Sequence, residues 1–495
     1  MILTVLLSAM LNIIPAPVDY TVRERACATT KTTVQTGSSE FKKATASLQD
    51  FQKKEAYRLT IEPGRILIEA LTNEGVFRAR TTLEQLQATT AELPCCVIFD
   101  YPRFRHRGLM LDESRSFKGV DFIKKQIDAM AALKLNVLHL HLDDSAGWRI
   151  ESDTYPRLTG MTAYRQGWDY FAWEKGGYKF ADPHEPGASG GFYTKADLRE
   201  IVAYAAARYI TVIPEIEMPG HSMEVGYAYP EVLCVHPNGN IHKGAWDLCP
   251  GSEATYKLLE SVLDEVMDIF PGKYIHIGGD EATMKTWREC VNCKALMEKE
   301  GYTDVHQLQG YMIRRIEAHV RSRGRRVIGW DEILETGVPK SAVIQSWRGI
   351  SGGVKASRQG HDVVMSPSTH CYFNYYQDLI RKEPPACGEL VSLRFAYGYE
   401  PVTPEMDASH ILGLQANLWC EYIPTASHAE YMLYPRLFAL AETAWTPAAE
   451  KEFFGFRKRA RTLLDVFRAK GYNTFNLDTE SGLAQSGLQR YPVKR

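Results

Sequence analysis

Short apolar runs alternate with longer segments of helical periodicity over most of the chain beyond residue 104. In the segments 121–133 and 254–270, apolar side chains recur every three or four residues, which predicts amphipathic helices. The runs between such segments are rich in Val, Ile and Leu, as is typical of buried strands. Strands that alternate with helices predict a parallel sheet. The eight predicted strands are Arg107–Asp112, Asn136–Asp143, Ile210–Ile216, Tyr274–Ile277, Arg326–Trp330, Val343–Trp347, Asp362–Ser366 and Ile411–Leu418.

Eight strands are the number that closes a TIM barrel, so we expect an α/β fold with a (β/α)8 barrel over residues 101–495. The alternative is an open, doubly wound sheet. Such sheets commonly carry a glycine-rich phosphate loop after the first strand, and no such loop follows Arg107–Asp112. The barrel is therefore the favoured prediction.

The first hundred residues show a different pattern. Tyr57–Ile61 and Arg65–Glu69 are strand-like runs on either side of a Pro-Gly pair, which predicts a hairpin. The segment 76–86 has helical spacing, and 41–51 is a further candidate helix. We predict a small α+β N-terminal domain over residues 12–100, ahead of the barrel.

Composition and charge narrow the function classes. A chain of 495 residues suits two domains, and its 45% hydrophobic and 24% charged residues indicate a globular protein rather than a disordered one. The formal net charge of −2 argues against a nucleic-acid partner or an anionic membrane surface. Apart from the apolar start, no run is long enough to suggest a membrane span.

The N-terminus has two interpretations. Residues 2–11 are apolar enough for the core of a short signal peptide, although no basic residue precedes them and no clear cleavage site follows. Alternatively, a truncated leader runs into a first strand near Asn12–Ile14. The apolar start favours a periplasmic or secreted protein over a cytoplasmic one.

Ten cysteines in a chain of this length do not indicate a disulfide scaffold. Cys290-x-x-Cys293 is the one suggestive pair. A zinc site would need two further ligands, and the spacing shows no obvious second pair. A local disulfide or two plain thiols is the favoured interpretation, and Cys95-Cys96, Cys234 and Cys249 stay unassigned.

In a TIM barrel the chemistry lies at the carboxyl ends of the strands, so the residues there are candidates. Trp330, Trp347 and Trp419 stand at such ends, and because exposed indoles are costly we expect them to line a pocket. Polar residues recur at the same ends around the predicted barrel. They include Asp112, Arg115, Asp144, Glu217, His221 and Glu421.

The fourth predicted strand ends in Gly278-Gly279 and then in two adjacent carboxylates, Asp280 and Glu281. The glycines let the backbone bend or admit a close neighbour. Two like charges side by side repel, so one of the two pKa values should rise unless both face water. A protonated carboxyl beside an ionised one suits general-acid chemistry. A solvated strand end is the alternative, and the glycines after a buried strand favour the functional interpretation.

Several motifs together resemble the family 20 glycoside hydrolases, the β-N-acetylhexosaminidases. The resemblance covers nearly the whole chain, because the first hundred residues look like the small N-terminal domain of that family. The matching motifs lie at 107–115 (RGLMLDESR), 139–144, 214–221, 276–281 (HIGGDE), 330–332, 347, 371–374 and 418–421.

The resemblance implies substrate-assisted catalysis. The 2-acetamido oxygen of the substrate would attack the anomeric carbon and form an oxazolinium-like intermediate, so no protein nucleophile would be needed. Glu281 would act as the general acid and then as the base for water. Asp280 would orient the acetamido N–H and stabilise its positive charge. No metal and no cofactor are implied.

The resemblance also assigns residues to the sugar-binding pocket. Arg115 would bind the 3- and 4-hydroxyls, with a salt bridge at the barrel rim as the structural alternative. Asp144 and His221 would tune the acid, with a satisfied core histidine as the alternative for His221. Tyr372 would hydrogen-bond the acetamido carbonyl, Glu421 would accept the outer hydroxyls, and Trp330, Trp347 and Trp419 would form the aromatic walls.

Two positions depart from the family pattern. Glu217 stands where many members carry Asp, and Asn374 stands where some have Asp near the acetamide or hydroxyl contacts. Either departure would alter substrate preference and neither touches the two carboxylates. His139, His141 and His276 are predicted to be core residues, because their sequence positions suggest no metal cluster.

We therefore expect a retaining exo-β-N-acetylhexosaminidase, a glycoside hydrolase that removes terminal β-linked GlcNAc or GalNAc from glycans. A lacto-N-biosidase-like enzyme that releases a disaccharide is one alternative, and a glycosidase with two opposed carboxylates is another. A carbohydrate-binding pseudoenzyme is disfavoured by the intact Asp280, Glu281, Tyr372 and Arg115. The sequence does not indicate an oligomeric state.

Overall fold

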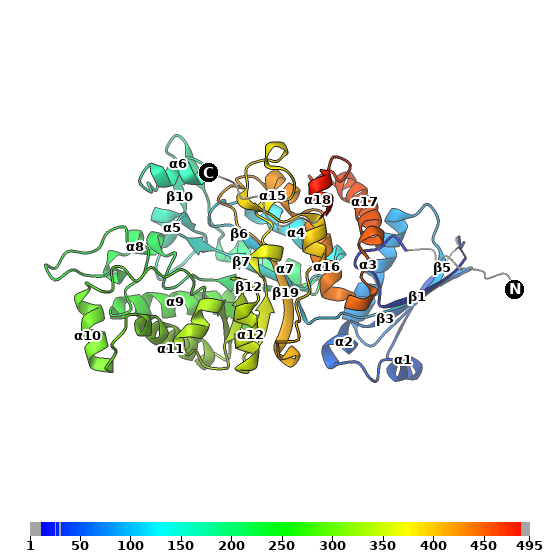
Figure 1. Cartoon of the computed structure of the whole chain (residues 1–495), viewed down its shortest axis with the longest axis horizontal. Coiled ribbons are helices and arrows are strands. Elements are labelled where there is room, and N and C mark those ends of the chain that lie inside the picture. The colour runs from blue at the N-terminus through cyan, green and yellow to red at the C-terminus, as the bar shows by residue number, and fades with distance from the viewer. Residues whose placement is uncertain (1–10, 25, 29–30, 487–495) are drawn as a thin grey trace.

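The computed structural model describes residues 11–24, 26–28 and 31–486, which form two units (Figure 1). Residues 1–10, which hold most of the predicted signal-peptide core, lie outside this description. Asn12–Ile14 form no strand, so the alternative of a first strand there is wrong; Ile13 packs into the core of the first unit. Among the described residues, no helix has both the length and the apolar character that a membrane crossing needs.

The first unit has the predicted α+β architecture and is built on a five-stranded sheet with the order β1-β5-β3-β4-β2. β3 and β4 form the predicted antiparallel hairpin, and buried and half-buried residues alternate along β3. β2 pairs in parallel with β4. The strands are β1 (Asp19–Glu24), β2 (Thr32–Thr36), β3 (Tyr57–Glu62), β4 (Arg65–Ala70) and β5 (Cys95–Asp100).

Helix α3 (Asn73–Thr89) packs against β3 and β4 of this sheet. The predicted helix over 41–51 is instead two short helices, α1 (Ser39–Ala44) and α2 (Asp50–Glu55). The break has a local cause. Thr45 donates its hydroxyl to the carbonyl of Phe41 at the end of α1, and a capping box at Gln49 begins α2.

The second unit is a closed barrel of eight parallel strands, as predicted. The strands follow the sequence order around the barrel, and β19 closes it by pairing with β6. They are β6 (His106–Asp112), β7 (Val137–His141), β12 (Thr211–Glu215), β13 (Tyr274–His276), β14 (Arg326–Trp330), β15 (Val343–Ser346), β16 (Val363–Met365) and β19 (Ile411–Leu418).

Helices follow most of the strands, and α7 begins with a capping box formed by Thr194 and Asp197. Only a 3-10 helix, Asp331–Thr336, separates β14 from β15. The main barrel helices are α4 (Gly119–Ala132), α7 (Lys195–Ala206), α9 (Glu253–Ile269), α11 (His306–Ser322), α12 (Ser351–Arg358), α14 (Leu393–Tyr397) and α16 (Arg436–Trp445). Shorter elements in the loops include α5 (Arg157–Thr162), β10 (Tyr164–Gln166), α6 (Tyr170–Lys175), β11 (Ala188–Gly190), α8 (Met223–Ala228), α10 (Val291–Glu300) and α15 (Ala426–Leu433).

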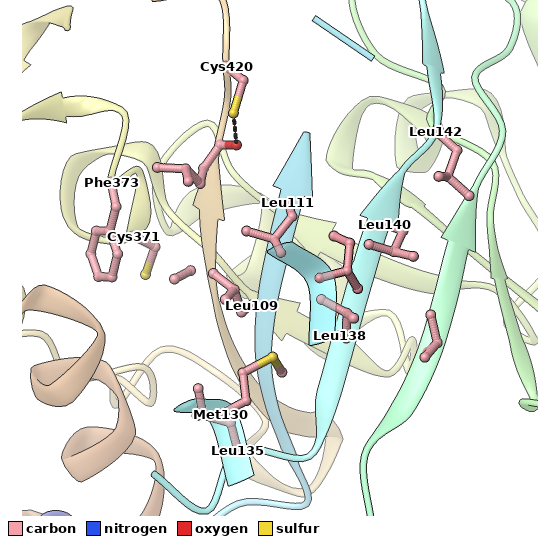
Figure 2. Close-up of a cluster of buried hydrophobic side chains, with 14 of the residues drawn as sticks. Leu109, Leu111, Met130, Leu135, Leu138, Leu140, Leu142, Cys371, Phe373 and Cys420 are labelled. Carbon is pink, nitrogen blue, oxygen red and sulfur yellow. Dashed lines mark hydrogen bonds between the residues drawn. The ribbon is translucent and has the colours of Figure 1, made fainter. Parts of the chain in front are cut away.

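Successive side chains of a barrel strand point alternately to the outer apolar core and to the interior of the barrel. Figure 2 shows Leu138 and Leu140 of β7 beside Leu109 and Leu111 of β6, in the apolar cluster that includes Met130 of α4. The residues between these leucines point to the opposite side of each strand, into the barrel. Along β7 the inward residues are Val137, which packs with other strand residues, and then the two histidines. Polar side chains therefore enter the barrel toward the carboxyl end of the strand, while the leucines cover its outer face.

The junction between the two units is continuous. Trp445, at the end of α16, packs into the core of the first unit and donates its indole N–H to Asp100 at 2.8 Å. Arg107 of β6 lies over the Trp445 ring and pairs with Glu55. Helix α17 (Phe453–Ala469) also contacts α3 (Figure 1). This junction lies at the start of β6 and leaves the carboxyl ends of the strands clear.

Candidate active site

A pocket of about 370 Å³ lies at the carboxyl ends of the barrel strands. Every residue that the family resemblance assigns to the site lines it except Trp330. Its walls come from the segments that follow seven of the eight barrel strands, all except β14, as the barrel prediction requires. The lining residues are Arg115, Asp144, Tyr170, Phe171, Glu174, Glu217, His221, Trp246, Asp280, Glu281, Trp347, Tyr372, Asn374, Tyr375, Cys387, Trp419, Glu421 and Tyr422.

The turn after β13 places the two carboxylates. Gly278 and Gly279 have φ values of 61° and 99°, and a Cβ on Gly278 would lie 1.8 Å from a carboxylate oxygen of Glu217. Glycine is thus required by both the backbone conformation and the close neighbour. Glu281 itself has φ 46°, a left-handed conformation that is costly for a residue with a side chain. The turn holds this strain next to the pocket.

Asp280 and Glu281 differ in exposure although they are adjacent. The Asp280 side chain is 11% exposed and the Glu281 side chain is 58% exposed. Both approach the same nitrogen of His221: Nε2 lies 3.7 Å from an Asp280 oxygen and 3.4 Å from a Glu281 oxygen. The two carboxylates therefore share one side of the pocket.

The environments of the two carboxyls shift their pKa values in opposite directions. Burial raises the pKa of Asp280 to about 6, against the attraction of His221. The contact with His221 lowers the pKa of Glu281. One pKa of the pair rises, as the sequence predicts, and the structure assigns that rise to Asp280. Because Glu281 faces water, a ligand that covers it would shift its pKa upward by desolvation.

An ionic network supports His221 from behind. Its Nδ1 lies 3.0 Å from an oxygen of Asp144, and Nη2 of Arg115 lies 2.6 Å from the same oxygen. Although burial opposes it, the charges of Arg115 and His221 hold the pKa of Asp144 well below its usual range. Against its own burial, the carboxylate of Asp144 raises the pKa of His221 well above its usual range. The network thus favours the protonated form of His221, whose ring faces both catalytic candidates.

Arg115 combines the two roles considered for it. It forms buried ion pairs, and it also lines the pocket, where its guanidinium lies 5.0 Å from the Trp419 ring centre and 3.8 Å from a Glu421 oxygen. A positive, planar group is therefore held beside an aromatic face and a carboxylate. This combination suits a polyhydroxylated ligand that offers both donors and acceptors.

Aromatic rings form another wall. Trp347 and Tyr372 stack nearly parallel with ring centres 6.1 Å apart, and Trp419 lies 6.3 Å from Tyr372. Trp330 is only 1% exposed and packs under this wall, 5.8 Å from Trp419. It belongs to the aromatic cluster of the floor rather than to the lining. Asn374 lines the pocket, and its amide oxygen has no partner among the described residues.

Two protein-family models match the two units of this chain. The model described as "Glycosyl hydrolase family 20, catalytic domain" matches residues 104–448. The chain belongs to glycosyl hydrolase family 20. A second model, "Glycosyl hydrolase family 20, domain 2", matches residues 21–101, which include the five-stranded sheet of the first unit except the start of β1.

Relatives of this family 20 chain carry related names. It is 41% identical to a β-hexosaminidase of Porphyromonas gingivalis over 82% of this chain, and the match spans 53%, or about half, of that protein. It is 33% identical to a β-hexosaminidase of Akkermansia muciniphila, with 82% of each chain covered. The crystal structure of an exo-β-N-acetylglucosaminidase from Vibrio harveyi in complex with N-acetylglucosamine matches at 30% identity and a TM-score of 0.81, over 95% of this chain and 79% of that one.

Sequence reasoning missed part of the family 20 pocket. Tyr170, Phe171 and Glu174 reach it from α6, which lies in the long insertion after β7. The one sequence signal for them is the aromatic and glycine content of the segment 155–191, which indicates a loop but does not show where it folds. Trp246 comes from the loop after β12, and its ring packs 4.9 Å from that of His221.

The three strand histidines are buried, as predicted, but they are not isolated from carboxylates. His139, His141 and His276 all pair with Glu215, which the sequence reasoning left without a role. Despite its burial, the charges of these histidines hold the pKa of Glu215 well below its usual range. Three neighbouring strands, β7, β12 and β13, bring these four residues together, so the sequence spacing could not reveal the cluster.

Of the two interpretations of Cys290 and Cys293, the local disulfide is wrong and the two thiols are confirmed. Cys290 and Cys293 are not disulfide-bonded to each other; they lie with Cys234 and Cys249, the second pair that the spacing did not reveal. Cys95, unassigned from sequence, forms a disulfide with Cys27. The expectation that the catalytic pocket uses no metal remains a prediction.

Proposed function

We propose that this chain is a retaining exo-β-N-acetylhexosaminidase that removes terminal β-linked N-acetylhexosamine by substrate-assisted catalysis. The observation that carries the proposal is the placement of a buried Asp280 and an exposed Glu281 on one side of the pocket. A glycosidase with its own nucleophile places its carboxylates on opposite faces of the sugar, about 5–5.5 Å apart. Adjacent carboxylates on one side suit a substrate that supplies the nucleophile.

In the first step the acetamido oxygen forms a bond to the anomeric carbon while the glycosidic bond breaks. The leaving oxygen takes the proton from Glu281, whose acidic form is favoured once the sugar excludes water from it. The ionised Asp280 accepts a hydrogen bond from the acetamido N–H, and its negative charge stabilises the positive oxazolinium ring. In the second step Glu281 takes a proton from water, which attacks the anomeric carbon and reopens the ring.

The surrounding groups support this assignment. Tyr372 lies beside Trp347 and Trp419, where its hydroxyl could position the acetamide among aromatic faces. The volume of about 370 Å³ lies near the lower end of the roughly 300–1,000 Å³ typical of ligand pockets, which favours a single sugar over a disaccharide. The relatives named β-hexosaminidase add independent support.

A matched pair of chromogenic substrates tests the proposal. We expect the β-GlcNAc glycoside to be hydrolysed and the β-glucoside with the same leaving group to be left intact, because only the first carries the acetamido nucleophile. Cleavage of both would contradict substrate assistance and indicate a protein nucleophile. Cleavage of neither would contradict monosaccharide release, and a chromogenic lacto-N-bioside together with a binding assay would then separate a disaccharide-releasing enzyme from a pseudoenzyme.

The buried Asp280 predicts an acidic limb in the pH profile. With a pKa of about 6 in the free protein, Asp280 loses its charge as the pH falls through that value. Since the ionised form is needed at the oxazolinium, kcat/KM should fall with decreasing pH below about 6. The measurement is kcat/KM against pH on the β-GlcNAc glycoside.

Two variants test whether the acidic limb of the kcat/KM profile belongs to Asp280. Asp280→Asn cannot ionise, so the residual activity should lose the limb. Glu332→Gln is the matched control, because burial also raises the pKa of Glu332, to about 8, and this residue contacts Trp347 rather than the sugar site directly. A limb that persists in Asp280→Asn and disappears in Glu332→Gln would refute the assignment.

We also propose that the protein works in an oxidising compartment, the periplasm or the exterior. The Cys27–Cys95 disulfide supports this location, since such bonds are rare where thiols are kept reduced. Cell fractionation with a cytoplasmic marker tests it, and co-fractionation with that marker would refute it.

A further inference from the structure

Four buried cysteines meet beside the catalytic loops, on segments that are far apart in the chain. Cys234 and Cys249 lie in the loop between β12 and α9, and Cys290 and Cys293 lie where α10 begins. All four have no exposed surface. Their sulfur atoms lie within 4.8 Å of one another.

The sulfur spacing matches a metal rather than disulfides. Three of the Sγ–Sγ distances are 3.6 Å (Cys249 to Cys290), 3.6 Å (Cys249 to Cys293) and 3.8 Å (Cys234 to Cys293). A disulfide needs about 2.05 Å. Four thiolates around a tetrahedral Zn²⁺, each at about 2.3 Å, have edges of ~3.8 Å.

The surroundings are those of a closed site. Trp287, Met284, Val305 and Leu308 pack around the sulfurs and exclude water. The backbone N–H of Val235 points to Cys290 Sγ at 3.4 Å. Cys290 is the N-cap residue of α10 and Cys293 lies in the first helical turn, where the helix dipole stabilises negative charge.

We propose that these four cysteines bind one structural Zn²⁺. On binding, the four thiols release four protons, and the resulting thiolates leave the site with a net charge of −2. A tetrahedral set of four sulfurs is selective for zinc or iron, and the absence of an open coordination position in the described surroundings indicates a structural ion rather than a catalytic one.

The four-cysteine site is connected to the loops that form the pocket. Between Cys234 and Cys249 the chain carries Trp246, which packs on His221, and Asp247. Asp247 accepts hydrogen bonds from the backbone N–H groups of Thr283 and Met284, at 3.0 and 2.8 Å. These two residues directly follow the turn that carries Glu281. Zinc would therefore cross-link the two loops that hold His221 and the carboxylate pair.

Metal analysis of the purified full chain tests this proposal independently of its activity. Prepared without chelator, the protein should contain one zinc per chain by mass spectrometry of the metal, and X-ray absorption should give four sulfur neighbours. The double variant Cys234→Ser with Cys290→Ser should lose the zinc. Cys96→Ser is the matched control, since Cys96 is an equally buried free cysteine in the other unit and should leave the zinc content unchanged.

A second measurement covers the case in which the double variant does not fold. Treating the wild-type protein with a strong zinc chelator should lower its unfolding temperature by several degrees, and added Zn²⁺ should restore it. The proposal would be overturned if the protein contained no metal and the four cysteines formed two disulfides. Intact-mass measurement would show this as a loss of four hydrogens, in addition to the two lost in the Cys27–Cys95 bond. Iron in place of zinc, seen as colour and in the metal analysis, would overturn the choice of metal.

Discussion

Glu281→Gln is expected to lower kcat for a natural disaccharide by about 10²–10⁴-fold, the usual contribution of a general acid. The variant keeps the shape of the side chain but has no proton to give to the leaving oxygen. Affinity should change little, because Glu281 lies at the exposed edge of the pocket. The measurement is steady-state kinetics on a natural disaccharide, together with binding of free N-acetylglucosamine.

The dependence on the leaving group provides the internal control. A substrate whose leaving group departs without a proton, such as a nitrophenyl glycoside, should lose far less rate in the first chemical step than the disaccharide. Glu298→Gln is the control variant, since Glu298 is an exposed residue of α10 outside the pocket and should behave like the wild type. Unchanged turnover of the disaccharide by Glu281→Gln would exclude Glu281 as the acid.

Asp280→Asn is expected to lower kcat by about 10²–10³-fold, the range seen when one group that stabilises transition-state charge is removed. By the relation of about 1.36 kcal/mol per tenfold change, this corresponds to about 2.7–4 kcal/mol of lost transition-state stabilisation. The effect should be large because Asp280 is buried, so its charge acts through little water. Single-turnover kinetics and substrate affinity would be measured in parallel.

Comparing the effect of Asp280→Asn on the rate with its effect on substrate affinity decides the role of Asp280. A loss in rate with little loss in affinity is expected, because the acetamide becomes positive only as the ring forms. A loss in affinity alone would make Asp280 a binding group. Circular dichroism should verify the fold of the variant, since Asp280 lies in a strained turn against His221 and Gly220.

The barrel and its candidate catalytic pair are predictable from the sequence for local reasons. Each strand lies within a short apolar run, and each main helix has an apolar stripe, so periodicity identifies both without knowledge of their neighbours. Asp280 and Glu281 are adjacent in the chain, and the glycines before them mark the turn. The helix predicted over 41–51 failed for an equally local reason, because Thr45 and Gln49 act as caps.

Periodicity and motifs alone predict the order of the strands, a pocket at their carboxyl ends and the family pattern of the residues around it. The folded chain was needed to show that Asp280 is the buried member of the pair, that Trp330 lies under the pocket, and that Cys234 and Cys249 meet Cys290 and Cys293. These features depend on which distant segments barrel closure brings together, and on how much water is then left around each side chain.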